Sequence, residues 1–409
     1  MLHIIWLIFI VSAFIASIYQ VVVLGQVDTF SDVMQAISAM AKLSVEIAIG
    51  LIGLLAFWLG IFQVAEQSGL ISKLSRVLAP LLTRIMPEIP KDHPALGSIT
   101  MNMSANILGL DNAATPLGIK AMQDMQTLAS DITTLTNAQI LFLVLNTSSV
   151  TLFPIAVFLY RAEQGAATPT DVFIPILLAT SASTLVGLIV TCLVQRINVF
   201  NRVILIYLVG IFSLLFAVIL YFTQLAAEEM ALQSSLVANS LLFSFIVLVL
   251  VVGWRKGLNT YDLFVEGAKK GFDVAINIIP FLLAMLIAIG MLRASGVMDV
   301  AVDGIASLIG LLGFDTRFVD GLPTALMKPL SGSGARALMI ETMQFHGADS
   351  FAGRLASVLQ GSTETTFYVL AVYLGAVGIK HSRYAVGCCL VADLAGIITA
   401  ILVSYWFFA

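Results

Sequence analysis

The chain has 409 residues, of which 59% are hydrophobic and only 11% charged, whereas about a quarter of the residues in soluble domains are charged. Apolar runs of roughly 20 residues, long enough to cross a bilayer, recur along the whole length and leave no room for a sizeable soluble domain. The composition therefore predicts an integral membrane protein. The net charge of −4 argues against a nucleic-acid partner.

Hydropathy predicts about nine membrane-spanning helices in the lipid bilayer. The first run, residues 2–24, is too long for a signal-peptide core and lacks a small-residue cleavage site, so we expect a retained span. Shorter amphipathic stretches at 26–41, 70–86, 257–270 and 297–312 are expected to lie at the membrane interface. The remaining spans are expected at 43–65, 138–160, 172–195, 203–223, 232–253, 272–292, 355–376 and 384–408.

Two polar stretches interrupt this apolar pattern, one at 94–106 and the other at 323–335. Aligned on their first prolines, they place Asn102 opposite Ser331. The first could rise only about 18 Å as a helix, against roughly 30 Å for the hydrocarbon core. Polar backbone at membrane depth is tolerated only where it is buried in protein or lines a cavity. We therefore interpret both stretches as re-entrant helical hairpins beside a pathway.

Short matches in the same order indicate an internal duplication. The repeats are predicted at 1–200 and 231–409, with a linking transmembrane helix in 201–230. The matched segments are 66–70 with 293–297, 145–149 with 359–363, and 185–189 with 394–398.

Charged loops orient the predicted spans. With re-entrant hairpins, the basic clusters fall on the cytoplasmic side, the amino terminus lies inside and the carboxyl terminus outside. The two repeats are then inverted, which is the common plan of secondary transporters. The sequence thus predicts an all-α polytopic protein of the bacterial inner membrane with an inverted-topology repeat. The basic clusters are Arg196 with Arg202; Arg255, Lys256, Lys269 and Lys270; Lys73, Arg76, Arg84 and Lys91; and Lys380 with Arg383.

Amides and hydroxyls of the first repeat are candidates for one wall of a substrate site. Asn102 and Asn106 are four residues apart and share a helical face. In the turn that follows, we expect Asp111 and Asn112 at the tip and Pro116 at the start of the returning helix. The alternative role of these polar groups is interhelical hydrogen bonding. The candidate residues of this wall are Asn102, Ser104, Asn106, Asn146, Thr147, Ser148 and Ser149.

The second polar stretch is rich in glycine and flanked by cations. Its glycines free backbone N–H groups that can cradle an anion, and Lys328 and Arg336 add positive charge. The alternative is that the glycines permit a tight turn and the cations extend to the interface. The candidates are Lys328, Ser331, Gly332, Ser333, Gly334 and Arg336.

Glu364 lies within an apolar span, and an ionisable residue there is a functional candidate. It could hold a coupling cation, carry a proton or meet a cationic substrate group; alternatively it pairs with Lys328 or Arg336. Asp393 could act similarly or pair with an arginine. We expect coupling to Na⁺ or H⁺ and no other cofactor. Their neighbours Gln360, Ser362 and Thr363 are substrate candidates, and Thr365 is a candidate for ion coupling.

Nothing in the sequence indicates metal chemistry or catalysis. The three cysteines, Cys192, Cys388 and Cys389, lie in apolar spans and match neither a disulfide framework nor a set of metal ligands. There is no P-loop motif and no Ser-His-Asp pattern, so we expect no enzyme, although a second catalytic group near Glu364 would change that expectation.

The polar motifs resemble those of a known group of membrane proteins. The segment 101–116, together with 120–123, looks like spore maturation protein A, and the segments 328–335 and 360–368 look like spore maturation protein B. The chain thus resembles a fusion of the two over nearly its full length. The resemblance implies the nucleoside-recognition or gate domain, shared more distantly with concentrative nucleoside transporters and ferrous-iron transporters. It supports paired re-entrant hairpins and alternating access.

Two functions remain open from the sequence. The first is a secondary transporter of a small polar solute, of anionic, zwitterionic or nucleoside-like character. The second is a non-transporting scaffold for envelope or spore-maturation assembly. A homo-oligomer is compatible with both. A polar-lined cavity between the hairpin tips would favour transport, and a packed apolar centre would favour the scaffold.

Overall fold

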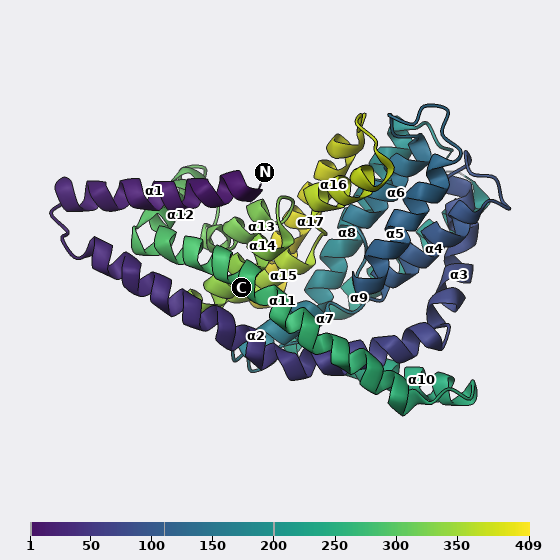
Figure 1. Cartoon of the computed structure of the whole chain (residues 1–409), viewed down its shortest axis with the longest axis horizontal. Coiled ribbons are helices and arrows are strands. Elements are labelled where there is room, and N and C mark those ends of the chain that lie inside the picture. Colours follow the sequence, from purple (N-terminus) through teal and green to yellow (C-terminus); the bar gives the residue numbers. More distant parts are fainter. Residues whose placement is uncertain (1, 110, 199–200) are drawn as a thin grey trace. The chain divides into compact units, whose positions relative to one another are not determined.

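The computed structural model describes the chain apart from residues 1, 110 and 199–200 (Figure 1). Every named element in the described part is a helix. The chain is an all-α polytopic membrane protein, as its composition predicts. The first helices are α1 (Leu2–Val22), α2 (Thr29–Gln67), α3 (Leu70–Ile85), α4 (Pro94–Ile107), α5 (Asp111–Gln126), α6 (Asn137–Thr147), α7 (Ile155–Glu163), α8 (Phe173–Val194) and α9 (Arg202–Phe222). The others are α10 (Ala227–Arg255), α11 (Thr260–Ala294), α12 (Val297–Leu311), the 3₁₀ turn η1 (Arg317–Gly321), α13 (Leu322–Met327), α14 (Gly332–His346), α15 (Phe351–Gly361), α16 (Thr366–Val377) and α17 (Ala385–Phe408).

Helices α10–α17 follow a pattern of lengths similar to that of α1–α8, with α9 between the two series; the pair α4 and α13 differs most, with 14 and 6 residues. The longest helices, α2 and α11, have 39 and 35 residues, and the short helices α6 and α15 have 11 each. Helices α3 and α12 both start after a left-handed glycine, Gly69 at φ 71° and Gly296 at φ 72°. Since this backbone conformation strains residues with a β-carbon, the glycines explain why the break recurs there.

Seven helices are long and apolar enough to cross a membrane in the described part of the chain. Two expected spans, 138–160 and 355–376, are wrong as continuous helices. The first divides into α6 and α7, and the second into α15 and α16. The first break contains Pro154, which has no N–H to donate to the helix, and the second follows Gly361, which lowers helix stability.

Two stretches expected to lie separately at the interface, 26–41 and 257–270, instead belong largely to the long helices α2 and α11. A helix of 39 residues rises about 58 Å, well beyond the roughly 30 Å hydrocarbon core. The charged part of α2 includes the exposed pair Lys42–Glu46, spaced for one helical face, with 3.5 Å between nitrogen and oxygen. Such a pair of opposite charges stabilises a helix slightly, so charge just after this stretch is compatible with a continuous α2.

The two polar stretches differ in where they turn. Helix α4 runs unbroken through Asn102 and Asn106, and the chain turns afterwards at Gly109, at φ 71°. In the second stretch α13 already ends at Met327, and Ser331 caps α14. The alignment of Asn102 with Ser331 therefore does not pair equivalent positions. Pro116 lies inside α5 rather than at its start.

The chain forms two compact units, each built from helices of both series. Unit 1 comprises residues 1–60, 157–169 and 264–360, and unit 2 comprises 61–156, 170–263 and 361–409. Unit 1 thus combines α1, α7 and the beginning of α2 with α11–α15, while unit 2 combines α3–α6 with α10 and α16. Helices α8, α9 and α17 also belong to unit 2.

Candidate functional site

The two helix breaks, one between α6 and α7 and one between α15 and α16, meet inside unit 2. The backbone N–H of Glu364 donates a hydrogen bond to the carbonyl oxygen of Thr147, at 2.9 Å. Thr147 ends α6, and Glu364 lies between α15 and α16. A backbone group released from one helix is therefore satisfied by the other, as burial requires. Glu364 itself is half-buried.

Side chains at the end of α6 favour the break. The hydroxyls of Thr147 and Ser148 both donate to the carbonyl oxygen of Val144, at 3.0 and 2.7 Å. Such local bonds compete with the helical backbone pattern. The hydroxyl of Thr184, from α8, donates to the carbonyl oxygen of Ser148. Hydroxyl groups from two helices thus bind backbone carbonyls at the break.

Helices α8 and α17 pack against each other beside these breaks, and each has a glycine at the contact. A β-carbon on Gly187 would lie 2.9 Å from Val144 Cγ1 and 3.2 Å from Ser148 Oγ. One on Gly396 would lie 2.7 Å from Thr363 Cγ2 and 3.2 Å from the carbonyl oxygen of Ser362. Both glycines therefore permit a helix to approach a break more closely than any larger residue would.

Asp393 of α17 is buried, with 2% of its surface exposed. Its Oδ2 accepts a hydrogen bond of 2.6 Å from the hydroxyl of Thr366, the first residue of α16. The carbonyl of the preceding residue, Ala392, accepts from Ser183 of α8 at 2.9 Å. The Asp393 carboxylate thus lies at the start of α16, the second half of a broken helix, which Thr365 precedes.

The amides of the first hairpin connect it to the first break. Asn106 Nδ2 donates to Asn146 Oδ1 at 2.8 Å, and Asn146 Nδ2 donates to the Phe142 carbonyl at 2.9 Å. Asn102 Nδ2 donates to the Ala114 carbonyl in α5 at 2.7 Å. The hydroxyl of Ser104 returns to the Thr100 carbonyl of its own helix. Asn102 therefore holds the two helices of the hairpin together, Ser104 bonds only within α4, and Asn106 reaches the break.

Each break also contains a buried hydroxyl without a hydrogen-bond partner among the described residues. They are Ser149 Oγ in the first break and Thr363 Oγ1 in the second, and both side chains are 3% exposed. Buried polar atoms are nearly always satisfied by protein or water. Two unsatisfied hydroxyls from corresponding breaks are the kind of groups that a polar ligand satisfies.

The glycine-rich tip lies in unit 1, and some of its polar groups form hydrogen bonds with one another. Ser331 Oγ accepts from the N–H of Gly334 at 3.0 Å and lies 3.2 Å from Ser333 Oγ. Lys328 is buried, with 6% exposed, and the Arg336 guanidinium lies 5.2 Å from the centre of the Tyr160 ring. One N–H expected to bind an anion is thus used by the cap, and Gly332 begins the helix.

The predicted residues are divided between the units. In unit 2 the candidates lie in or beside the breaks, apart from Asn102 and Ser104, which bond within the hairpin. Unit 1 contains Gln360, whose Oε1 has no partner among the described residues, together with the glycine-rich tip. The residues in unit 2 are Asn102, Ser104, Asn106, Asn146, Thr147, Ser148, Ser149, Ser362, Thr363, Glu364, Thr365 and Asp393.

Sequence reasoning missed Arg161, whose side chain is fully buried in unit 1. It donates to the Ala348 carbonyl at 2.8 Å and pairs with Asp349 at 3.1 Å. Asp349 also accepts from the N–H of Ala167, at 2.8 Å. The arginine follows an apolar run, but Ala348 and Asp349 lie almost 190 positions later, so no local pattern indicates the contact.

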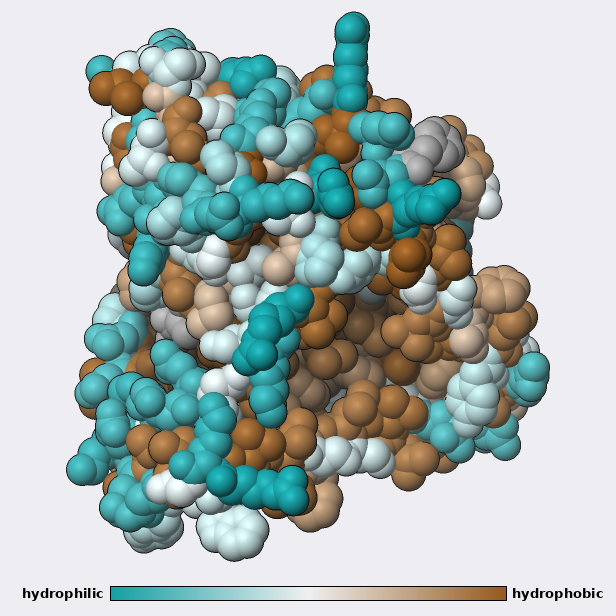
Figure 2. Space-filling view, turned by 90° about the vertical axis from the view of Figure 1, so that its right-hand side faces the viewer, coloured by the Kyte–Doolittle hydropathy of each residue, from teal (hydrophilic) through white to brown (hydrophobic). Residues whose placement is uncertain are grey.

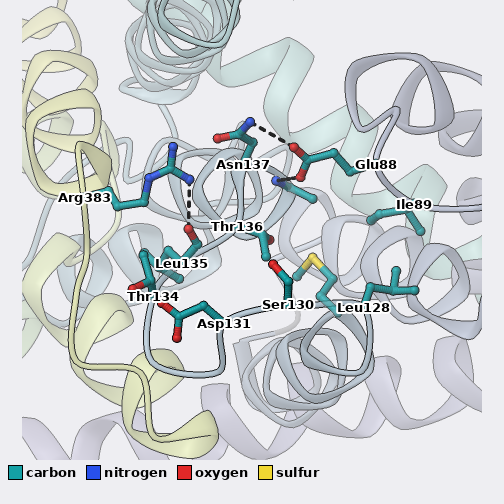
Figure 3. A pocket seen from close by; sticks show the side chains of 12 residues that line it. Glu88, Ile89, Leu128, Ser130, Asp131, Thr134, Leu135, Thr136, Asn137 and Arg383 are labelled. Atoms are coloured by element: carbon teal, nitrogen blue, oxygen red, sulfur yellow. Dashed lines mark hydrogen bonds between the residues drawn. The ribbon is translucent and has the colours of Figure 1, made fainter.

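Unit 2 has a similar contact between two of its loops, residues 133–135 and 380–383. Figure 3 shows part of it. The Thr133 carbonyl accepts from the N–H groups of Lys380 and His381, at 2.9 and 3.1 Å. Arg383 donates to the Leu135 carbonyl at 2.9 Å. Beside them lies a cavity of about 400 Å³ lined by Glu88, Asp131 and Asn137 among others. Hydrogen bonds from the Thr133 backbone and from threonine hydroxyls lower the pKa of Asp131.

Comparison with known proteins gives a consistent result. The Gate family, described as Nucleoside recognition, matches residues 48–163 and 275–380. Spore maturation protein A of Bacillus subtilis (strain 168) is 44% identical over 162 residues, which are 40% of this chain and 83% of that protein. Spore maturation protein B of the same organism is 44% identical over 155 residues, 38% of this chain and 85% of that protein. No solved structure matches the chain.

Proposed function

The chain belongs to the Gate family, described as Nucleoside recognition, and on that premise we propose that it is a secondary transporter of a small polar solute. The observation that carries the proposal is the pair of broken helices joined by the bond from Glu364 to Thr147. Broken helices whose freed backbone and polar groups face a substrate are the common construction of secondary transporters.

We place the chain in the bacterial cytoplasmic membrane with its amino terminus inside and its carboxyl terminus outside. Under this orientation the two helix series are inverted relative to each other, and the basic loops face the cytoplasm. Inverted repeats give two alternative arrangements of similar energy, which is what alternating access to a central site requires. Both hairpins are then re-entrant, one from each side.

The solute that suits these residues has hydroxyl or amide groups. In unit 2, Ser149 and Thr363 offer hydroxyls without partners among the described residues, and the amides of Asn106 and Asn146 lie beside the first break. These groups suit a nucleoside-like or zwitterionic solute. In unit 1, taken by itself, the glycine-rich tip with Lys328 suits an anionic group. Glu364 and Asp393 provide the carboxylates that Na⁺ or H⁺ coupling needs, and the neighbouring Thr365 offers a further oxygen.

Uptake into proteoliposomes tests the proposal. Metabolites that accumulate in or disappear from a deletion strain select the labelled solute, and uptake is then measured with a Na⁺ or a pH gradient. We expect Glu364→Gln to fold but to lose uptake or its cation dependence. Glu46→Gln, on an exposed face of α2, is the matched control and should transport normally. Unchanged uptake by Glu364→Gln would remove the carboxylate from the mechanism.

A role in envelope assembly is the second candidate, because both relatives are named for spore maturation. A scaffold requires the fold but not the polar groups in the breaks. Replacement of both Ser149 and Thr363 by alanine therefore separates the two functions. If the protein is a scaffold, the double variant should still restore the deletion strain; if it is a transporter, the double variant should not.

A further inference from the structure

Helix α3 presents a cationic stripe to its surroundings. Lys73, Arg76 and Arg84 are exposed, and so are Val77 and Pro80 between them. Their spacing of three or four residues places all five on one helical face, over a length of about 16 Å. The helix has no acidic residue. Its charge is therefore not balanced by neighbours on the same helix.

The opposite face of α3 is fixed to the protein. Ile71, Leu82 and Ile85 are buried, and the Ser75 hydroxyl donates to Thr100 Oγ1 of α4 at 2.6 Å. Tyr207 of α9 donates to the Val77 carbonyl. The stripe thus cannot turn inward without breaking these contacts, and it is rigidly connected to the hairpin of Asn102 and Asn106.

A distant part of the chain adds charge to the same surface. A β-carbon on Gly69, just before α3, would lie 2.9 Å from the ammonium nitrogen of Lys256. Lys256 lies two residues after Trp254, whose side chain is 73% exposed, and tryptophan is enriched at the membrane–water interface. Figure 2 shows hydrophilic and apolar residues mixed on the face where Figure 1 draws α3.

The corresponding helix α12 has the opposite charge. It has the same type of glycine start and nearly the same length, but it presents Asp299 and Asp303, and Asp299 pairs with Arg293 at 3.0 Å. The common fold therefore does not require the cations of α3. A difference in the surroundings of the two helices explains their opposite charges, since basic amphipathic helices bind anionic lipid surfaces.

We propose that the stripe of α3, extended by Lys256, binds the headgroups of anionic phospholipids in the membrane. Cationic side chains meet the phosphates, while Val77 and Pro80 contact the acyl boundary. Because Ser75 connects α3 to α4, bound lipid would hold the first hairpin in place. The inference rests on the proposed function only for this second effect, since lipid binding does not require transport.

Native mass spectrometry of the detergent-solubilised full chain tests the proposal with phosphatidylglycerol and phosphatidylcholine as probes. We expect phosphatidylglycerol adducts on the natural chain and weak phosphatidylcholine binding. Each cation removed should weaken phosphatidylglycerol binding about five-fold, so Lys73→Gln/Arg76→Gln/Arg84→Gln should lose nearly all of it. The matched control, Lys42→Gln/Lys269→Gln/Lys380→Gln, removes three exposed cations elsewhere and should retain it.

Two outcomes would overturn the lipid site. In the first, the triple variant carries as many phosphatidylglycerol adducts as the natural chain. In the second, the control variant loses as many adducts as the triple variant. Competition by glycerol phosphate as strong as by the lipid would assign the stripe to a free phosphate instead. If transport is absent while the adducts behave as expected, the proposed function fails and the lipid site stands.

Discussion

The N–H of Glu364 and the carbonyl of Thr147, 2.9 Å apart, join two helices that are each interrupted within an apolar run. Each interruption satisfies a backbone group of the other, because one provides the donor and the other the acceptor. The bond places a carboxylate-bearing segment against a hydroxyl-rich one. The contacts that hold this arrangement together can be tested one at a time.

The glycines of α8 and α17 should be intolerant of larger residues. Gly396→Val should destabilise the fold by about 1–3 kcal/mol, because overpacking forces neighbours to move, and should impair any transport. Gly387, also on α17, has open space where a β-carbon would be added, so Gly387→Ala is the control. Thermal unfolding can be followed with a thiol-reactive dye, since all three cysteines are buried. Equal unfolding midpoints for the Gly396→Val variant and the natural chain would show that the close approach of α17 to the break is unimportant.

Removal of Asp349 should leave the buried Arg161 without the carboxylate of its ion pair. Because Asp349 is 36% exposed, we expect Asp349→Ala to cost about 3 kcal/mol, at the lower end for broken buried pairs. Arg161→Met/Asp349→Ala should recover part of that loss, as measured by a double-mutant cycle in the same unfolding assay. For comparison, Lys42→Gln disrupts an exposed pair and should cost less than about 0.5 kcal/mol. If the unfolding free energies lost in the two single variants simply add up in the double variant, the pairing is contradicted.

The bond between Asn106 and Asn146 should hold the first hairpin to the first break. Asn146→Leu leaves the Asn106 amide without its acceptor, at a cost of about 1–3 kcal/mol. Ser104→Ala is the control on the same helix, since its hydroxyl only returns to the Thr100 carbonyl. Hydrogen exchange in α4 should rise in the first variant and not in the second. Similar exchange in both would argue that the amide pair is dispensable.

The stability of the loop around Asp131 should decrease at acidic pH. Bonds from Thr133 lower its pKa below the ordinary 3.8, so the carboxylate stabilises the folded loop at neutral pH. This stabilisation is lost as the pH falls through 3.8 to the lowered folded value. Protection of residues 131–136 against hydrogen exchange should fall in that range, and Asp131→Asn should show low protection throughout. Constant protection of the natural loop would contradict the assignment.

The sequence was sufficient for the broad architecture because the signals involved are local. Long apolar runs predict spans, and the recurrence of short motifs such as 185–189 and 394–398 predicts matching helices. Polar residues such as Glu364 and Asn146 are conspicuous in apolar surroundings, so the candidate site residues could be chosen. Their chemistry follows from residue type alone.

Pro154 and Gly361 mark in the sequence where two predicted spans are weakened, but only the tertiary structure showed that the helices are interrupted there. The positions of the hairpin turns and the contact of Arg161 with Asp349 also required the tertiary structure. A run such as 138–160 is apolar enough to remain helical, and partners from other segments, among them Thr184 and Glu364, bind backbone carbonyls at its break. Hydropathy sums over neighbours in sequence, whereas these bonds join residues far apart. Composition thus determined that the chain is a helical membrane protein, and the long-range pairing of buried polar groups decided where its helices are interrupted.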